Sequence, residues 1–252
     1  MPGPPTLKTG CCGFPLALSR YAQVFSLVEV QQTFYQPPLP RTLERWRAKA
    51  GPMFEFTLKA WQLITHEASS PTYRRLREKL TEKERREAGA FRLNTTVMRA
   101  WELTLVCARI LNARVILFQA PPRFGPTEAN RSNLQAFFRE IRRAARSGER
   151  AEETTFVWEP RGEWKPDEVK DLCRELNLVH GVDPFKQKPM TSGLGYFRLH
   201  GRTGYRYAYS DPDLQELLEV ARAYEPCYVL FNNVSMLEDA RRFVKLASRK
   251  PA

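Results

Sequence analysis

The sequence predicts an α/β protein whose strands close into a (β/α)8 barrel, the TIM-barrel class, as one domain over residues 1–252. Short apolar runs alternate with longer amphipathic stretches along the whole chain. Strands that alternate with helices pair in parallel through helical crossovers, and eight such units suit a chain of 252 residues. An open doubly wound sheet is the alternative, but it usually carries a glycine-rich nucleotide loop, which this sequence lacks.

The elements are expected in a regular order. Strands are predicted at residues 7–11, 27–33, 54–59, 114–119, 155–159, 178–182, 196–200 and 228–232. Helices are predicted at residues 42–49, 94–111, 134–146, 166–176, 213–224 and 237–246. Several helices open with a start signal, such as Pro166 followed by two acidic residues, or Ser210 followed by Asp211 and Pro212.

The alternation within strands supports closure. In the second strand, Val28 and Val30 share one face, while Glu29, Gln31 and Thr33 share the other. The third and seventh strands alternate in the same way, with polar faces made of Glu55, Thr57 and Lys59, and of Tyr196, Arg198 and His200. One face then packs on helices, and the other looks into the barrel with polar groups that must be paired or reach solvent.

Residues 71–93 break the alternation after the third strand. They hold eight Lys and Arg residues interleaved with four Glu residues. We expect a helical insertion at the mouth of the barrel. Interleaved signs favour a solvated, salt-bridged helix over a dedicated anion-binding arm.

The amino-acid composition indicates what kind of protein this is and what kind of partner it would bind. The net charge is +12, with 42% hydrophobic and 12% aromatic residues, which is globular rather than disordered. No apolar run approaches the roughly 20 residues of a membrane-spanning helix, and the N-terminus lacks a signal-peptide pattern. We therefore expect a cytoplasmic protein without membrane contact, whose charge favours a phosphate-bearing partner such as DNA or RNA. The oligomeric state stays open, and five cysteines without a Cys-x-x-Cys pair suggest reduced thiols.

Short motifs near the strand ends carry a resemblance to a known family. They are residues 10–14 (Gly-Cys-Cys-Gly-Phe), 28–35, 56–60 with 64–66, 117–121, 196–202 and 228–233. In this order the sequence resembles the YecE-like family (domain of unknown function 72), whose members are TIM-barrel proteins. It departs from the commoner pattern in the Cys-Cys-Gly-Phe turn and in Pro160, which interrupts a Glu-Phe-Arg run. The resemblance implies the barrel fold and no particular activity.

Polar side chains gather where the predicted strands end, and in TIM barrels those ends build the active site. We expect them to bind a polar, anionic ligand. The ligand-binding candidates are Gln31, Thr33, Tyr35, Gln119, Arg161, Asp183, Arg198, Arg202, Tyr205, Asn232 and Asn233. In the loop after the seventh strand, Arg202 and Tyr205 suit phosphate contact and base or sugar stacking, or else they belong to a surface loop packed on the next helix.

The catalytic candidates are Glu29, Lys59, His66, Glu159 and His200. Glu29 and Lys59 on neighbouring strands form either a buried ion pair that fixes packing or a pair that tunes an acid or base. Glu29 and Glu159 facing one cavity would instead suit acid/base chemistry on a glycoside or polyol.

The three histidines divide by position. His66 and His200 fall in strand-end motifs, where each is either a structural residue or a catalyst. Cationic neighbours would keep His200 neutral and able to act as a base. His180 has the opposite parity on its strand and is expected in the core.

No cofactor is predicted, and three histidines are too few for a multi-zinc centre. A single Mg²⁺ held by Glu159 or Asp183 with water stays open.

Three functions remain in competition. The leading one is a barrel that binds a phosphate-bearing ligand, such as nucleic acid, and cleaves a phosphodiester without a multi-metal centre. Arg198, Arg202 and Lys59 would neutralise the phosphate, with His200 and Glu159 as base or acid. The second is an acid/base or Schiff-base enzyme, such as an isomerase or lyase, on a small sugar, polyol or sugar phosphate, with Lys59 as the imine-forming amine. The third is a non-catalytic binding or scaffold protein.

Overall fold

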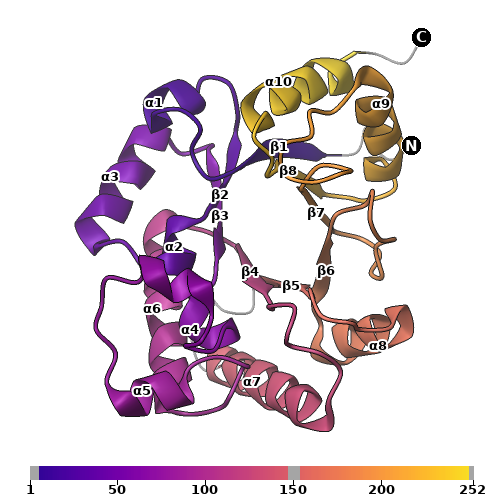
Figure 1. Ribbon diagram of the computed structural model, residues 1–252. Coiled ribbons are helices and arrows are strands. Elements are labelled where there is room, and N and C mark those ends of the chain that lie inside the picture. Colours follow the sequence, from indigo (N-terminus) through magenta and orange to yellow (C-terminus); the bar gives the residue numbers. More distant parts are fainter. Residues whose placement is uncertain (1–5, 147–153, 250–252) are drawn as a thin grey trace.

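The computed structural model describes residues 6–146 and 154–249, and within them the chain forms a closed barrel (Figure 1). The eight strands are parallel and follow chain order around the barrel, with the first hydrogen-bonded to the last. They are β1 (Leu7–Cys12), β2 (Leu27–Val30), β3 (Glu55–Lys59), β4 (Val115–Gln119), β5 (Thr155–Glu159), β6 (Val179–Val182), β7 (Gly195–Leu199) and β8 (Cys227–Phe231). The predicted (β/α)8 TIM-barrel class is confirmed.

Helices surround the barrel on its outer side (Figure 1). The six expected from the sequence are present as α3 (Pro40–Ala50), α6 (Thr95–Leu111), α7 (Glu128–Arg146), α8 (Pro166–Leu176), α9 (Asp211–Ala221) and α10 (Met236–Ala247). A short α1 (Leu18–Tyr21) follows β1, and no helix separates β6 from β7. Of the described helices, none is long and apolar enough to span a bilayer.

Two apolar layers hold the barrel together. Aromatic side chains such as Trp101, Phe118 and Phe137 pack between strands and helices, with ring centroids 5.8–6.3 Å apart. A smaller cluster, which includes Leu117 and Leu230, fills the barrel interior. The polar residues described below lie at the C-terminal end of that interior, as the strand alternation predicts.

The second strand is shorter than predicted and ends at Val30. The chain then turns into α2 (Gln32–Tyr35). The Thr33 hydroxyl lies 3.0 Å from the Val30 carbonyl and 2.7 Å from the Lys59 carbonyl, so its hydrogen bonding ties this turn to the ends of β2 and β3. Thr33 and Tyr35 therefore do not continue the inward face of the strand.

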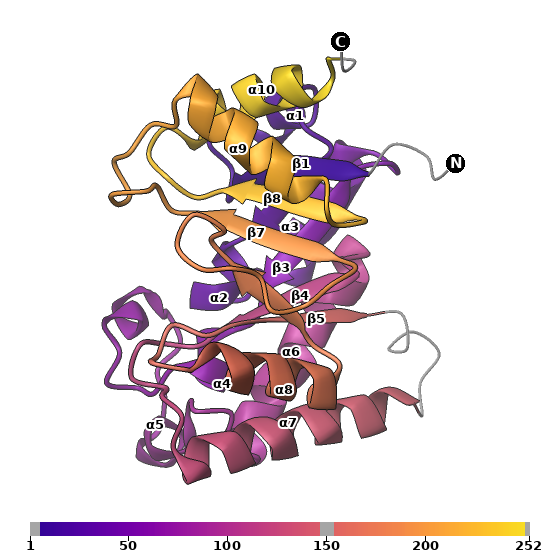
Figure 2. The same ribbon diagram turned by 90° about the vertical axis from the view of Figure 1, so that its right-hand side faces the viewer.

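The insertion after β3 is not one helix. After α4 (Gln62–Thr65), it contains a 3-10 turn, η1 (Pro71–Arg75), and the short α5 (Glu82–Glu87), which begins at a capping box made by Thr81 and Glu84. Leu76 and Leu80 between them pack on the hydrophobic core. Figure 2 shows α5 on the same side of the barrel as α2 and the loop after β7, which is the mouth formed by the C-terminal strand ends.

Candidate functional site

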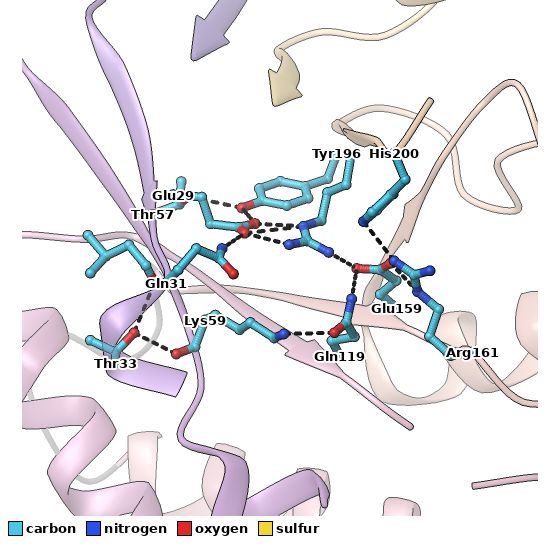
Figure 3. Close-up of polar contacts among 12 residues, drawn as sticks. Glu29, Gln31, Thr33, Thr57, Lys59, Gln119, Glu159, Arg161, Tyr196 and His200 are labelled. Atoms are coloured by element: carbon cyan, nitrogen blue, oxygen red, sulfur yellow. Dashed lines mark hydrogen bonds and ion pairs between the residues drawn. The ribbon is translucent and has the colours of Figure 1, made fainter. Parts of the chain in front are cut away.

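A buried arginine, Arg198, forms ion pairs with two carboxylates inside the barrel, those of Glu29 and Glu159, which Figure 3 labels. Arg198 on β7 donates from Nη2 to Glu29 Oε1 on β2 at 2.8 Å and from Nη1 to Glu159 Oε2 on β5 at 2.5 Å. The side chains of these three residues are 4% exposed or less. Alternation along three separate strands directs all of them inward, so the barrel brings together residues far apart in the sequence.

In this triad of Arg198, Glu29 and Glu159, the opposite charges stabilise one another in their ionised forms. Burial alone would lower the pKa of Arg198, but Glu159 and Glu29 raise it well above its ordinary value. Burial likewise would raise the pKa of Glu159, and Arg198 and Arg161 outweigh it, so that pKa lies below its ordinary value. Because two carboxylates already balance Arg198, the arrangement does not favour its predicted role in neutralising a phosphate.

Lys59 lies beside the triad, and among residues 6–146 and 154–249 it has no ion-pair partner. Its amine donates to Gln119 Oε1 at 2.7 Å and stands 3.7 Å from the centre of the Phe34 ring. The expected Glu29–Lys59 ion pair does not form, because Arg198 and Gln31 occupy Glu29. Burial, and next to it the charge of Arg198, lower the pKa of Lys59 from 10.5 to about 7. The amine is therefore about half neutral near pH 7.

Gln119 and Arg161 connect this amine to the rim of the mouth. Gln119 Nε2 donates to Glu159 Oε2 at 3.1 Å, and Arg161 Nε donates to Glu159 Oε1 at 2.6 Å. The Arg161 side chain is 34% exposed, whereas that of Glu159 is 4% exposed. Arg161 is thus the cation of the network that faces outward.

His200 completes the network. Its Nε2 lies 2.7 Å from Arg161 Nη2, and its backbone N–H donates to Asp183 Oδ2 at 2.8 Å. A guanidinium only donates, so Nε2 is the acceptor and the ring proton sits on Nδ1, 3.6 Å from Asp183 Oδ2. Burial lowers the pKa of His200, with Asp183 opposing and Arg198 adding to the shift. The pKa is lowered, as expected from the sequence, but burial rather than the cationic neighbours is the first cause, and Arg202 does not contribute.

Two members of the network were not among the candidates. The Tyr196 hydroxyl donates to Glu29 Oε2 at 2.7 Å and lies 2.9 Å from the Thr57 hydroxyl. Strand alternation in the sequence could have identified both residues, since Tyr196 lies on the same strand face as Arg198, and Thr57 on the same face as Lys59. Both residues are fully buried, Tyr196 bonds Glu29 directly, and Thr57 contacts Glu29 only through Tyr196.

Other predicted residues lie outside the network. His66 is buried against the Phe34 ring, and burial lowers its pKa to about 3, with Lys59 adding to the shift. Its Nδ1 contacts the Thr65 hydroxyl at 2.7 Å. Tyr35 packs under Arg75 at 3.5 Å, at the rim rather than in the centre.

In the loop after β7, Arg202 binds the following helix rather than the network around Arg198. Arg202 binds Asp213 and Glu216 of α9 and lies over the Phe185 ring, because the acidic first half of that helix attracts it. Tyr205 is 56% exposed, and its carbonyl accepts a hydrogen bond from the Val234 N–H at 2.8 Å.

Of the two asparagines after β8, the Asn233 side chain bonds within the fold, and Asn232 bonds β7 through its backbone. The Asn232 backbone N–H donates to the Leu199 carbonyl at 2.8 Å, and Asn233 Nδ2 donates to Asp239 Oδ2 at 2.7 Å. His180 is buried outside the barrel interior next to Trp158 on the neighbouring strand, as predicted.

Metal ligation and thiol chemistry find little support in the described residues. No group of three or more His, Cys, Asp or Glu side chains there could hold a metal ion. Arg198 and Arg161 occupy the Glu159 carboxylate, and backbone N–H groups occupy Asp183. All five cysteines are buried and free, and burial raises the pKa of Cys11 to about 12.

Comparisons with known proteins agree with this architecture. A DUF72 family protein of Enterococcus faecalis has a TM-score of 0.71 at 20% identity and covers 98% of this chain and 99% of its own. A DUF72 family protein of Thermotoga maritima has a TM-score of 0.64 at 20% identity, with 97% and 100% covered. A D-psicose 3-epimerase structure determined with D-fructose present has a TM-score of 0.60 at 14% identity, with 96% and 98% covered.

At these identities the structural likeness shows the fold alone. No curated protein sequence matches the chain. The family model described as "Protein of unknown function DUF72" matches residues 13–251. The chain therefore belongs to the DUF72 family of TIM-barrel proteins.

Proposed function

We propose that this protein is an enzyme that acts on a small polar carbonyl compound of the sugar class, with the Lys59 amine as its nucleophile. The supporting observation is the environment of that amine at the end of β3. It is buried, bonded to an amide oxygen rather than a carboxylate, and has a pKa of about 7. Lysines that form Schiff bases need this loss of charge, because only the neutral amine attacks a carbonyl.

The pKa decides how much reactive amine exists. An ordinary lysine at pH 7 is neutral in roughly one molecule in a few thousand, whereas a pKa of about 7 makes half the molecules neutral. The neutral amine adds to the carbonyl carbon, a C–N bond forms, the carbonyl oxygen leaves as water with both amine protons, and the imine nitrogen then takes up one proton from solvent. The ionised Glu159 carboxylate then stabilises the cationic imine nearby.

The rest of the network suits an uncharged, hydroxyl-rich ligand. Two carboxylates balance Arg198, and Glu159 also binds Arg161, so the centre has little surplus positive charge. The amides of Gln31 and Gln119 supply donors and acceptors for hydroxyl groups. A ligand that draws Arg161 outward frees His200 Nε2 as a proton acceptor.

Similar folds do not choose between the candidate activities. Besides the D-psicose 3-epimerase, the similar structures include an AP endonuclease, family 2, from Brucella melitensis, at a TM-score of 0.57 and 16% identity. One barrel shape thus serves more than one chemistry, and the proposal depends on Lys59 rather than on the likeness.

Reductive trapping tests the proposal. The protein is incubated with aldoses, ketoses and short hydroxyaldehydes in the presence of borohydride, and adducts are located by peptide mass spectrometry. We expect one carbonyl compound to label Lys59, with a rate that rises with pH around a midpoint near 7. Lys59→Arg abolishes the adduct, and Lys8→Arg, at the opposite end of the barrel in an ion pair with Glu55, retains it.

Two outcomes would contradict the proposal. One is the absence of any adduct at Lys59 across the panel. The other is labelling of Lys59 no faster than labelling of exposed lysines such as Lys170 at pH 7.

A further inference from the structure

We infer that the insertion after β3 carries a surface that binds the phosphodiester backbone of nucleic acid. This basic surface is separate from the network around Lys59 and is built on η1, α5 and the turn between them. It consists of Arg74, Arg75, Arg77, Lys79, Arg85 and Arg86, all of them exposed.

Three of the four acidic residues of the insertion, Glu78, Glu84 and Glu87, bind other partners, and the fourth, Glu82, is exposed on α5. Arg99 on α6 binds Glu78 at 2.8 Å and Glu84 at 2.9 Å, and Glu84 also caps α5 through Thr81. Glu87 accepts a hydrogen bond from the Thr96 hydroxyl at 2.6 Å. These three carboxylates therefore tie the insertion to the barrel, and the six outward cations outnumber the one exposed carboxylate, Glu82.

The cations themselves have no acidic partner within the described parts of the chain. None of Arg74, Arg77, Lys79, Arg85 and Arg86 forms an ion pair there, and Arg75 lies over the Tyr35 ring. The sequence had favoured a salt-bridged helix, which would have cancelled these charges along its own face. The break into η1 and α5 prevents that pairing, with the exception of Lys83 and Glu87 at 3.7 Å.

Tertiary contacts hold the surface in one place. The Tyr73 hydroxyl on η1 donates to the His66 carbonyl at 2.7 Å, and Arg85 of α5 lies close enough to act electrostatically on that phenol. The backbone N–H of Arg77 donates to Gln36 Oε1 beside α2. Arginines from two separate elements thus stand together at the rim of the mouth, on a fixed support.

The chemistry of the surface favours nucleic acid over an anionic membrane. A helix or loop that binds lipid exposes large apolar side chains next to its cations. Here Leu76 and Leu80 pack inward, and none of the large exposed hydrophobic residues falls within residues 71–87. Five of the six cations are arginines, whose planar guanidinium groups match phosphate oxygens in pairs.

Oligonucleotide binding at several salt concentrations tests the inference. Fluorescence anisotropy with single-stranded DNA, duplex DNA and RNA compares the full chain with Arg77→Gln/Lys79→Gln/Arg86→Gln. The matched control is Arg241→Gln/Lys245→Gln/Arg249→Gln, three exposed cations on or beside α10, which lies far from α5 in Figures 1 and 2. We expect affinity to fall with salt, and the first variant to bind roughly tenfold to a hundredfold more weakly, with a flatter salt dependence.

Several outcomes would overturn the inference. Equal losses in the two variants would mean that net charge alone drives binding, and preference for phosphatidylserine vesicles would indicate a membrane. Absence of binding to every oligonucleotide would also refute it. Thermal melting checks that both variants fold, and Lys59 trapping in the same variants is unaffected by this surface, so the two proposals fail or succeed separately.

Discussion

At the scale of single residues, the most informative side chain is Lys59. Its amine is withdrawn from water and meets an amide and an aromatic ring, whereas a stabilising ion pair would need a carboxylate in contact. The folded protein therefore holds this lysine in a less favourable state than the unfolded chain does. Such a cost is typical of residues kept for chemistry rather than for stability.

Replacing Lys59 by Met should stabilise the fold. The unfolded chain keeps this lysine protonated up to a pKa of about 10.5, and the folded chain binds the proton only below about 7. The penalty is complete below pH 7 and disappears as pH rises to 10.5, where the unfolded state loses its extra proton. Lys59→Met also removes the hydrogen-bond donor to Gln119 Oε1, which costs part of this gain. We therefore expect a net increase of about 1–3 kcal/mol in the unfolding free energy at pH 7.

Urea unfolding from pH 6 to pH 10 measures this effect. The gain from Lys59→Met should shrink across the alkaline half of the series, while Lys245→Met on the surface of α10 should change stability little at any pH. A loss of stability at pH 7 would mean that Lys59 is charged and well paired in the folded protein.

At the scale of elements, two serines at helix starts differ in what they do. The Ser210 hydroxyl accepts from the Asp213 N–H and Asp213 Oδ2 accepts from the Ser210 N–H, a complete capping box at α9. Ser235 precedes α10 and makes no capping hydrogen bond from its side chain. The sequence signal was correct for α9, where Ser210 is followed by Asp211 and Pro212.

We expect Ser210→Ala to lower the unfolding free energy by about 1 kcal/mol, since it leaves a backbone N–H of α9 without its partner. Ser235→Ala serves as the matched control and should cost no more than a few tenths of a kcal/mol. Chemical denaturation of the two variants side by side decides the matter, and equal losses would contradict the assignment.

At the scale of the whole molecule, Arg198 couples three strands that are not neighbours in the sheet. It joins Glu29 of β2 to Glu159 of β5, across the interior of the barrel. Removing one member leaves buried charge without compensation, which costs far more than an exposed ion pair is worth.

Arg198→Met should therefore cost about 3–5 kcal/mol of unfolding free energy in the native chain. The same substitution should cost less than about 2 kcal/mol in a Glu29→Gln/Glu159→Gln background, because no carboxylate is then stranded. Denaturant unfolding of the four proteins completes this cycle. Equal costs in both backgrounds would show that the three side chains act independently.

Much of the fold could be predicted from the sequence, and the reasons are local. Alternation with a period of two placed Glu29, Thr57, Lys59 and Arg198 on inward faces, and the crossover pattern implied parallel strands. The end of β2 could not be predicted, since Thr33 bonds to the Lys59 carbonyl from a different strand. The insertion after β3 was predicted as a helix, but it breaks into η1 and α5. The sequence does not show this break, because the inward positions of Leu76 and Leu80 depend on the core on which they pack.

Local pattern and the family resemblance thus predicted a parallel barrel with polar groups at one end of its interior, and the pairing of β1 with β8 confirms that the sheet closes. Only the tertiary structure decided which of those groups touch. In the tertiary structure Arg198 pairs with two carboxylates, Arg202 pairs with acidic residues of α9, and Lys59 forms no ion pair with any residue that the structure describes. Partner choice depends on distances of a few ångströms between strands that are far apart in the chain, and hydrophobic periodicity contains no such information.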